Sequence, residues 1–91
     1  MVIKIRELVT HASTNSDGTK IYNEIDHSDN VSIIFDFEDI EYVTSSFLNS
    51  SLIPFLEVKG FPYFKSKVSF TNTNPQINKA INRVFKYHLE S

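Results

Sequence analysis

Four acidic residues fall within six positions, directly after the most apolar stretch of the chain: Asp36, Glu38, Asp39 and Glu41. Carboxylates in such a group could bind a hard cation or act in acid–base catalysis if they converged on one point. Their spacing is not that of a calcium-binding loop, and a solvated acidic turn is the simpler interpretation. Asp36 is typical of a strand-end residue that bonds turn amides. An enzyme or ligand-binding protein using this turn would need a pocket beside Asp36 and a strongly shifted carboxylate pKa.

The other residue types that carry catalysis or bind metals do not form known motifs. His11, His27 and His88 are far apart and lack the i, i+4 pairing of a zinc-binding helix. The chain has no cysteine, which excludes disulfides and thiol catalysis. Its two glycines, Gly18 and Gly60, are isolated, so no glycine-rich phosphate loop is present. We therefore predict no catalytic residue, no metal site, no cofactor and no enzyme activity.

Three consecutive hydroxyl residues, Thr44, Ser45 and Ser46, precede a second apolar stretch. Each is a good helix N-cap, so the sequence predicts a helix that begins near residue 45. Its buried stripe would be Phe47, Leu48, Leu52, Phe55 and Leu56. Pro54 lies inside this stripe and removes one intrahelical hydrogen bond, so we expect a kink or a restart there.

Hydrophobic patterning predicts the elements of the first half. Residues 2–9 begin with alternating apolar and charged side chains, which indicates a half-buried strand near a sheet edge. Residues 10–18 are polar and predict a loop, followed by a short helix from Gly18 to about His27. Residues 31–37 are almost wholly apolar and predict a central strand covered on both faces.

The second half predicts an aromatic loop at residues 59–65 and a short strand around Val68 and Phe70. A final helix begins at Pro75, with Asn74 as its N-cap. The resulting order is β-α-β-α-β-α, which is typical of the α/β class. We expect one domain over residues 1–91, built as a small mixed sheet with helices packed on it.

Composition narrows the class of protein further. The 91 residues carry a net charge of -2, and the nine Lys and Arg residues do not cluster along the sequence, which disfavours nucleic-acid binding. No segment approaches the roughly 20 apolar residues of a membrane span, and the N-terminal residues show no apolar signal-peptide core. We expect a cytoplasmic protein that binds no membrane.

Residues 33–56 resemble the signature of STAS domains, the fold of bacterial anti-sigma factor antagonists. In that signature a central strand leads through a short loop to a Ser-Ser pair that opens a helix. The closer similarity is to a STAS-like family of unknown function, in which the strand ends Asp-Phe and the helix opens Ser-Phe-Leu. Those elements are Asp36-Phe37 and Ser46-Phe47-Leu48 here.

This resemblance implies a regulatory module that binds another protein. In anti-sigma factor antagonists, a partner kinase of the histidine-kinase-like ATPase type phosphorylates the first Ser of the pair, which corresponds to Ser45, with Ser46 as the neighbouring candidate. The chain departs from the antagonists at two positions, with Thr44 in place of Asp and Phe47 in place of Gly. A phosphate would add roughly two negative charges near the acidic turn, which is a physical basis for a partner switch.

We expect the partner to contact the acidic turn, the start of the helix and the aromatic segment. The predicted contact residues are Asp36, Glu38, Asp39, Thr44, Phe47, Asn49, Phe61 and Tyr63. The aromatic residues could instead fold over the sheet edge and complete the core. The alternative function is a structural or oligomerising subunit without a switch, forming a homodimer through the aromatic segment or through the edge strand at residues 2–9.

Overall fold

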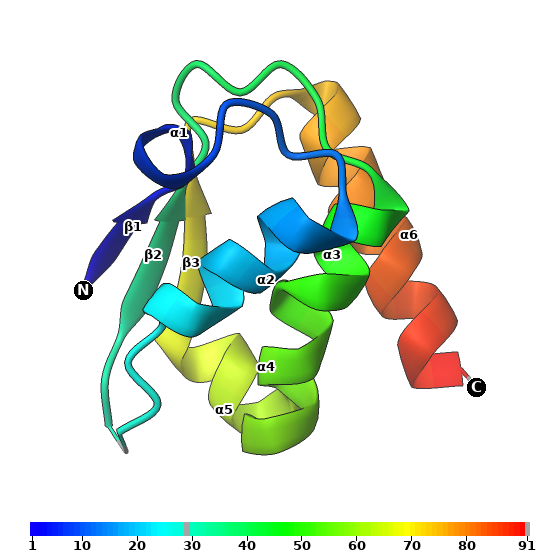
Figure 1. The fold of residues 1–91 in the computed structure, drawn as a ribbon. Coiled ribbons are helices and arrows are strands. Elements are labelled where there is room, and N and C mark those ends of the chain that lie inside the picture. The colour runs from blue at the N-terminus through cyan, green and yellow to red at the C-terminus, as the bar shows by residue number, and fades with distance from the viewer. Residues whose placement is uncertain (29, 91) are drawn as a thin grey trace.

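Three short strands form a parallel sheet in the order β1-β2-β3 (Figure 1). The structure is a computed structural model, and it describes residues 1–28 and 30–90. The strands are β1 (Val2–Lys4), β2 (Ile33–Asp36) and β3 (Val68–Thr71). Both pairings are parallel, so the sheet is not mixed as predicted. Each connection passes through helices and returns the chain to the end of the sheet where the previous strand began, so the next strand runs in the same direction.

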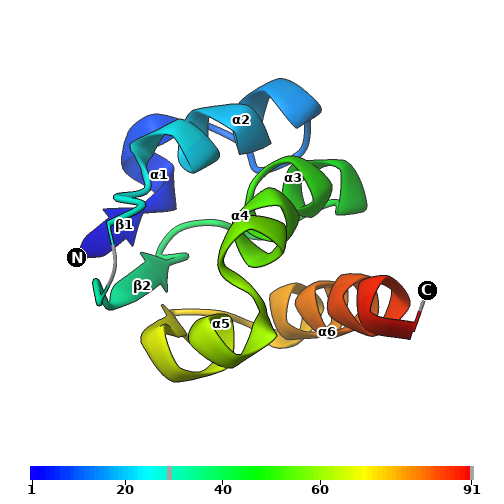
Figure 2. The same ribbon diagram turned by 90° about the horizontal axis from the view of Figure 1, so that it is seen from below.

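Helices fill both connections and follow the last strand. They are α1 (Ile5–Leu8) and α2 (Asn15–Glu24), then α3 (Ser45–Ser50), α4 (Leu52–Lys59) and α5 (Phe61–Lys67), and finally α6 (Pro75–Glu90). Figure 2 shows α2, α3, α4 and α6 on one side of the sheet. The predicted α/β class and the predicted alternation of strands and helices are confirmed.

The central position of β2 is confirmed, but the prediction that both of its faces are covered is wrong. Ile33 and Phe35 point into the core, and Phe35 lies in register between Ile3 of β1 and Phe70 of β3. Ile34 points to the opposite face and is only half-buried. In the described part of the chain, no helix packs on that second face (Figure 2). Apolar composition alone did not distinguish one covered face from two.

The N-terminal predictions are corrected at two points. β1 ends at Lys4, and the single turn of α1 then carries the chain off the edge of the sheet. The predicted loop over residues 10–18 is also wrong in its second half, since α2 begins at Asn15. Thr14 Oγ1 accepts a hydrogen bond from the Asp17 amide at 3.0 Å, and Asp17 Oδ2 accepts one from the Thr14 amide at 3.1 Å. This reciprocal capping box starts the helix at Asn15, three residues before Gly18.

The predicted restart in the second apolar stretch is present, but it falls at Ser51, between α3 and α4, rather than at Pro54. The Ser51 hydroxyl is buried and donates to the Phe47 carbonyl at 2.7 Å, so the break leaves no unpaired polar side chain there. Pro54 then lies in the first turn of α4, where a missing amide hydrogen costs little. The helix breaks three residues before the proline because Pro54 has no N–H to donate to Ser50.

The predicted aromatic loop is a helix, α5. Gly60 has φ 87°, a conformation that glycine adopts readily, and it ends α4 and begins α5. Pro62 lies in the first turn of α5, where its fixed φ suits a helix. The loop prediction is wrong because Gly60 and Pro62 are as typical of a helix start as of a turn.

The last strand and the last helix agree with prediction. Asn74 Oδ1 accepts a hydrogen bond from the Ile77 amide at 2.9 Å, with Pro75 as the first helical residue. The core-facing residues of α6 complete a single apolar cluster whose largest fully buried side chains are Phe35, Phe37, Phe47 and Phe55. Among the described helices, none is long and apolar enough to cross a membrane.

Candidate functional site

The start of α3 is held by hydrogen bonds from one residue, Thr44. Its Oγ1 accepts from the Phe47 amide at 3.2 Å, which caps the helix, and the same hydroxyl donates to the Ser13 carbonyl at 2.6 Å. The Thr44 amide donates to the Ala12 carbonyl at 3.2 Å. These bonds tie the beginning of α3 to the segment before α2, so the two segments hold each other in place.

Helices α2 and α3 approach each other closely at Gly18. A Cβ atom at Gly18 would lie 2.4 Å from the Phe47 carbonyl oxygen and 2.5 Å from Ser50 Oγ, which is closer than any real contact. The Ser50 hydroxyl also donates to Asn15 Oδ1 at 3.3 Å across the same junction. The exposed sides of α2 and α3 therefore form one continuous surface whose shape depends on glycine at position 18.

Ser45 and Ser46 lie in the first turn of α3, and both are exposed. Thr44 provides the cap, so neither serine is needed to hold the helix. Within the described residues, neither serine side chain makes a hydrogen bond. Asn49 is exposed one turn further along, and α3 contains no charged residue. The exposed side of α3 is therefore a small, uncharged, polar surface, and its two serine hydroxyl groups make no hydrogen bond within the described residues.

Asp36 has a structural role at the carboxyl end of β2. Its side chain accepts hydrogen bonds from Asn72 Nδ2 at 2.8 Å and from the Glu38 amide at 2.9 Å. These bonds stabilise the ionised carboxylate and lower its pKa, with the Asn72 bond the largest cause. The residue is only 9% exposed, so it offers a partner little surface. A carboxylate with a lowered pKa is also a poor general base at neutral pH.

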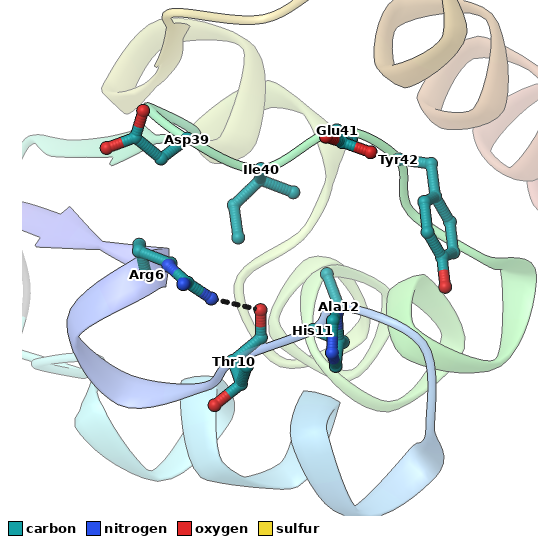
Figure 3. A pocket seen from close by; sticks show the side chains of 8 residues that line it. All are labelled: Arg6, Thr10, His11, Ala12, Asp39, Ile40, Glu41 and Tyr42. Atoms are coloured by element: carbon teal, nitrogen blue, oxygen red, sulfur yellow. Dashed lines mark hydrogen bonds between the residues drawn. The ribbon is translucent and has the colours of Figure 1, made fainter.

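The acidic turn borders two shallow hollows. One, of about 230 Å³, lies between the loop before α2 and the loop before α3 (Figure 3). Its residues are Arg6, Thr10, His11, Ala12, Asp39, Ile40, Glu41 and Tyr42. The other, of about 210 Å³, lies beside Asp36 and Glu38. Both are smaller than the roughly 300–1,000 Å³ typical of small-molecule sites.

The residues that line the larger hollow also lack the arrangement of a metal-binding or catalytic site. Figure 3 shows Ile40 and Ala12 pointing into it from its two walls, while the Asp39 carboxylate points away. The Arg6 guanidinium donates to the Thr10 carbonyl, so the main cation here already has a partner. Among the described residues, no group of three or more His, Cys, Asp or Glu side chains could hold a metal ion.

Phe47, predicted to contact a partner, is 0% exposed and packs in the core, so it is not available for contact. The bulky residue that replaces glycine of the antagonist motif therefore fills the space between helices rather than altering the surface. The sequence alone did not reveal this, because Phe47 could face either way at the start of a helix.

The aromatic segment does not join this surface. The Tyr63 hydroxyl donates to the Val31 carbonyl at 2.8 Å, and its ring packs against Phe55. Tyr63 therefore packs against the core. Phe61 remains 41% exposed. Both belong to α5, which lies at the other end of the molecule from the start of α3 (Figure 1). The prediction of a homodimer through this segment or through edge strand β1 stays a prediction.

The structure has a parallel sheet with helices on one side, and a serine pair opens the helix after the central strand, so it is a small α/β domain. The family model of the STAS-like domain of unknown function matches residues 17–78, and the chain belongs to this family. The matched segment runs from α2 through β2 and β3 into the first turn of α6. Comparisons with curated proteins and with solved structures give no match.

Proposed function

We propose that this chain is a regulatory module that binds another protein through the exposed face of α3. Phosphorylation of Ser45 or Ser46 by a histidine-kinase-like ATPase partner would switch this binding. The main support for the proposal is that the three hydroxyl residues at the start of α3 have different roles. Thr44 provides the cap, while Ser45 and Ser46 are exposed and make no side-chain hydrogen bond within the described residues.

This arrangement allows a covalent change without loss of fold. Modification of a capping hydroxyl would remove a hydrogen bond that stabilises the helix by about 1 kcal/mol. Modification of Ser45 or Ser46 removes no such bond. A phosphate there would extend into solvent and add roughly two negative charges to a surface that has none on α3 itself. The partner would therefore meet a different electrostatic surface on an unchanged backbone.

The surface is also held in one conformation before any partner arrives. The Thr44 bonds to Ser13 and Ala12, and the close contact at Gly18, fix α3 against α2. A preorganised surface loses less conformational entropy on binding than a mobile one. Asn49 extends the surface one turn further along α3, and the exposed acidic residues Glu38 and Asp39 lie in the loop that leads from β2 to α3.

The class of partner rests on the resemblance to anti-sigma factor antagonists. Their signature strand, loop and serine pair correspond to β2, the loop after it and the first turn of α3 in this chain. A histidine-kinase-like ATPase that both binds and phosphorylates the module is therefore the partner to search for first.

A pull-down from native lysate tests the proposal. The baits are the wild type, the Ser45→Asp/Ser46→Asp variant and a control, Ser66→Asp/Asn78→Asp. The control adds the same charge at exposed positions of α5 and α6 rather than on α3 itself. Circular dichroism of each bait checks that the fold is intact.

We expect an ATPase of this class to be retained by the wild type and by the control, and to be lost from the Ser45→Asp/Ser46→Asp bait. Incubating the captured partner with the wild type and ATP should then add a phosphate that mass spectrometry maps to Ser45 or Ser46. A partner retained equally by all three baits would contradict the switch.

A further inference from the structure

The cations are distributed unevenly in the fold. Six of the nine Lys and Arg residues follow residue 58, where Glu90 is the single acidic residue. Along the sequence these six cations are spread over residues 59–86, and three of them lie in α6. Lys79, Arg83 and Lys86 have i, i+4 and i+7 spacing, which places them on one helix face. We call these three residues the cationic stripe.

The cationic stripe faces solvent. The residues of α6 that pack into the core are Ile77, Ile81 and Val84, whereas all three residues of the stripe are exposed. None of the three makes an ion pair or side-chain hydrogen bond within the described residues. Tyr87, which is 78% exposed, adjoins the stripe in the last turns of the helix. Figure 2 shows α6 along one side of the molecule, with no element over its outer side.

An oppositely charged surface lies beyond the first turn of the same helix. Glu38, Asp39 and Glu41, which we call the acidic loop, are exposed and form no ion pair within the described residues. Tyr42 follows them and is 45% exposed. The side chain of Asn74 donates to the Glu41 carbonyl at 2.9 Å, which fixes the loop against the start of α6.

The near end of the cationic stripe lies close to the acidic loop, since Lys79 is five residues from Asn74, or about 7.5 Å along the helix axis. The far end of the stripe is too distant for the loop of the same molecule to neutralise it. The loop is bonded next to Asn74, whereas Lys86 lies twelve residues further along α6. At 1.5 Å per residue this separation is about 18 Å along the helix axis. The Debye length is about 8 Å at physiological ionic strength, so attraction over that distance is largely screened.

We propose that the cationic stripe binds the acidic loop of a second copy of this chain. The two surfaces carry opposite charge, each is flanked by an exposed tyrosine, and neither forms an ion pair with another of the described residues. A nucleic acid is a poorer fit, because three cations are few for such a site and the acidic loop beside the helix would repel a polyanion. The contact joins two different surfaces, so it is a head-to-tail association. It uses neither Ser45 nor Ser46 and does not depend on the proposed switch.

Sedimentation of the purified chain at several hundred micromolar, in low salt and in about 0.5 M NaCl, tests this proposal. One variant, Lys79→Glu/Lys86→Glu, reverses the stripe. Its matched control, Lys20→Glu/Lys65→Glu, changes the net charge equally at exposed positions of α2 and α5. A third variant, Glu38→Lys/Glu41→Lys, reverses the loop and leaves Asp39, whose φ of 63° disfavours lysine.

We expect the wild type and the matched control to self-associate in low salt and to be monomeric in high salt. Reversal of either surface should raise the dissociation constant about tenfold or more, because attraction becomes repulsion. An equimolar mixture of the stripe and loop variants should associate again, since each then meets its complement. A monomeric wild type in low salt, or equal behaviour of the stripe variant and its matched control, would overturn the proposal.

Discussion

Replacing Gly18 by alanine should destabilise the protein, although alanine is the better helix former. At an open helical position this change stabilises a helix by about 1 kcal/mol. Gly18 is not open, because its Cβ would lie 2.4 Å from the backbone oxygen of Phe47. An ordinary contact is about 1 Å longer, so α2 and α3 would have to separate by about that distance. A backbone oxygen cannot rotate away as a flexible side chain can.

Overpacking of this kind costs about 1–3 kcal/mol. We therefore expect Gly18→Ala to lower the free energy of unfolding by about that amount, measured by urea denaturation with circular dichroism. The neighbouring Thr19→Ala, at an exposed position of α2, is the control and should change it by less than about 0.5 kcal/mol. A Gly18→Ala variant as stable as the wild type, or more stable, would refute the close contact that joins the two helices of the candidate site.

Thr44→Val keeps the shape but removes the cap, and urea denaturation should show a loss of about 1–2 kcal/mol, against less than about 0.5 kcal/mol for Ser45→Ala. Hydrogen bonds lower the pKa of Asp36, so the stability advantage of the wild type over Asp36→Asn should be present at neutral pH. That advantage should disappear as the pH falls below about 4 and through the folded-state pKa, in urea titrations over a pH series. Gly60→Ala imposes φ 87° on a residue with a side chain and should cost about 1–3 kcal/mol in the same assay.

Local signals predicted the elements whose stability is largely local. The Asn74 cap, Pro75 and the apolar spacing of α6 are sufficient to define that helix. The capping box of α2 was equally visible as Thr14 and Asp17, but the polar composition around it favoured a loop prediction. The start of α2 is therefore indicated by the capping residues in the sequence, whereas the polar composition of residues 10–18 predicts a loop instead.

The features that depend on contacts between distant segments could not be predicted. The sequence predicts Gly18 at the end of a loop, because nothing local indicates that α3 packs against that glycine. The serine pair was identified from sequence, but Thr44 as the residue that caps α3 became clear only from its bonds to Phe47 and Ser13. Whether a side chain faces the core or a partner is decided by tertiary packing.

The central claim is that the side chains of Ser45 and Ser46 do not stabilise the fold and lie at the centre of a binding surface. The most direct test is the affinity of the purified partner ATPase for the wild type and for Ser45→Asp/Ser46→Asp, measured by isothermal titration calorimetry. Two added charges at a docking surface should weaken binding by roughly tenfold to a hundredfold, while the unfolding free energy of the variant stays within about 0.5 kcal/mol of the wild type. Equal affinities, or a variant that binds weakly only because it is unfolded, would contradict the account.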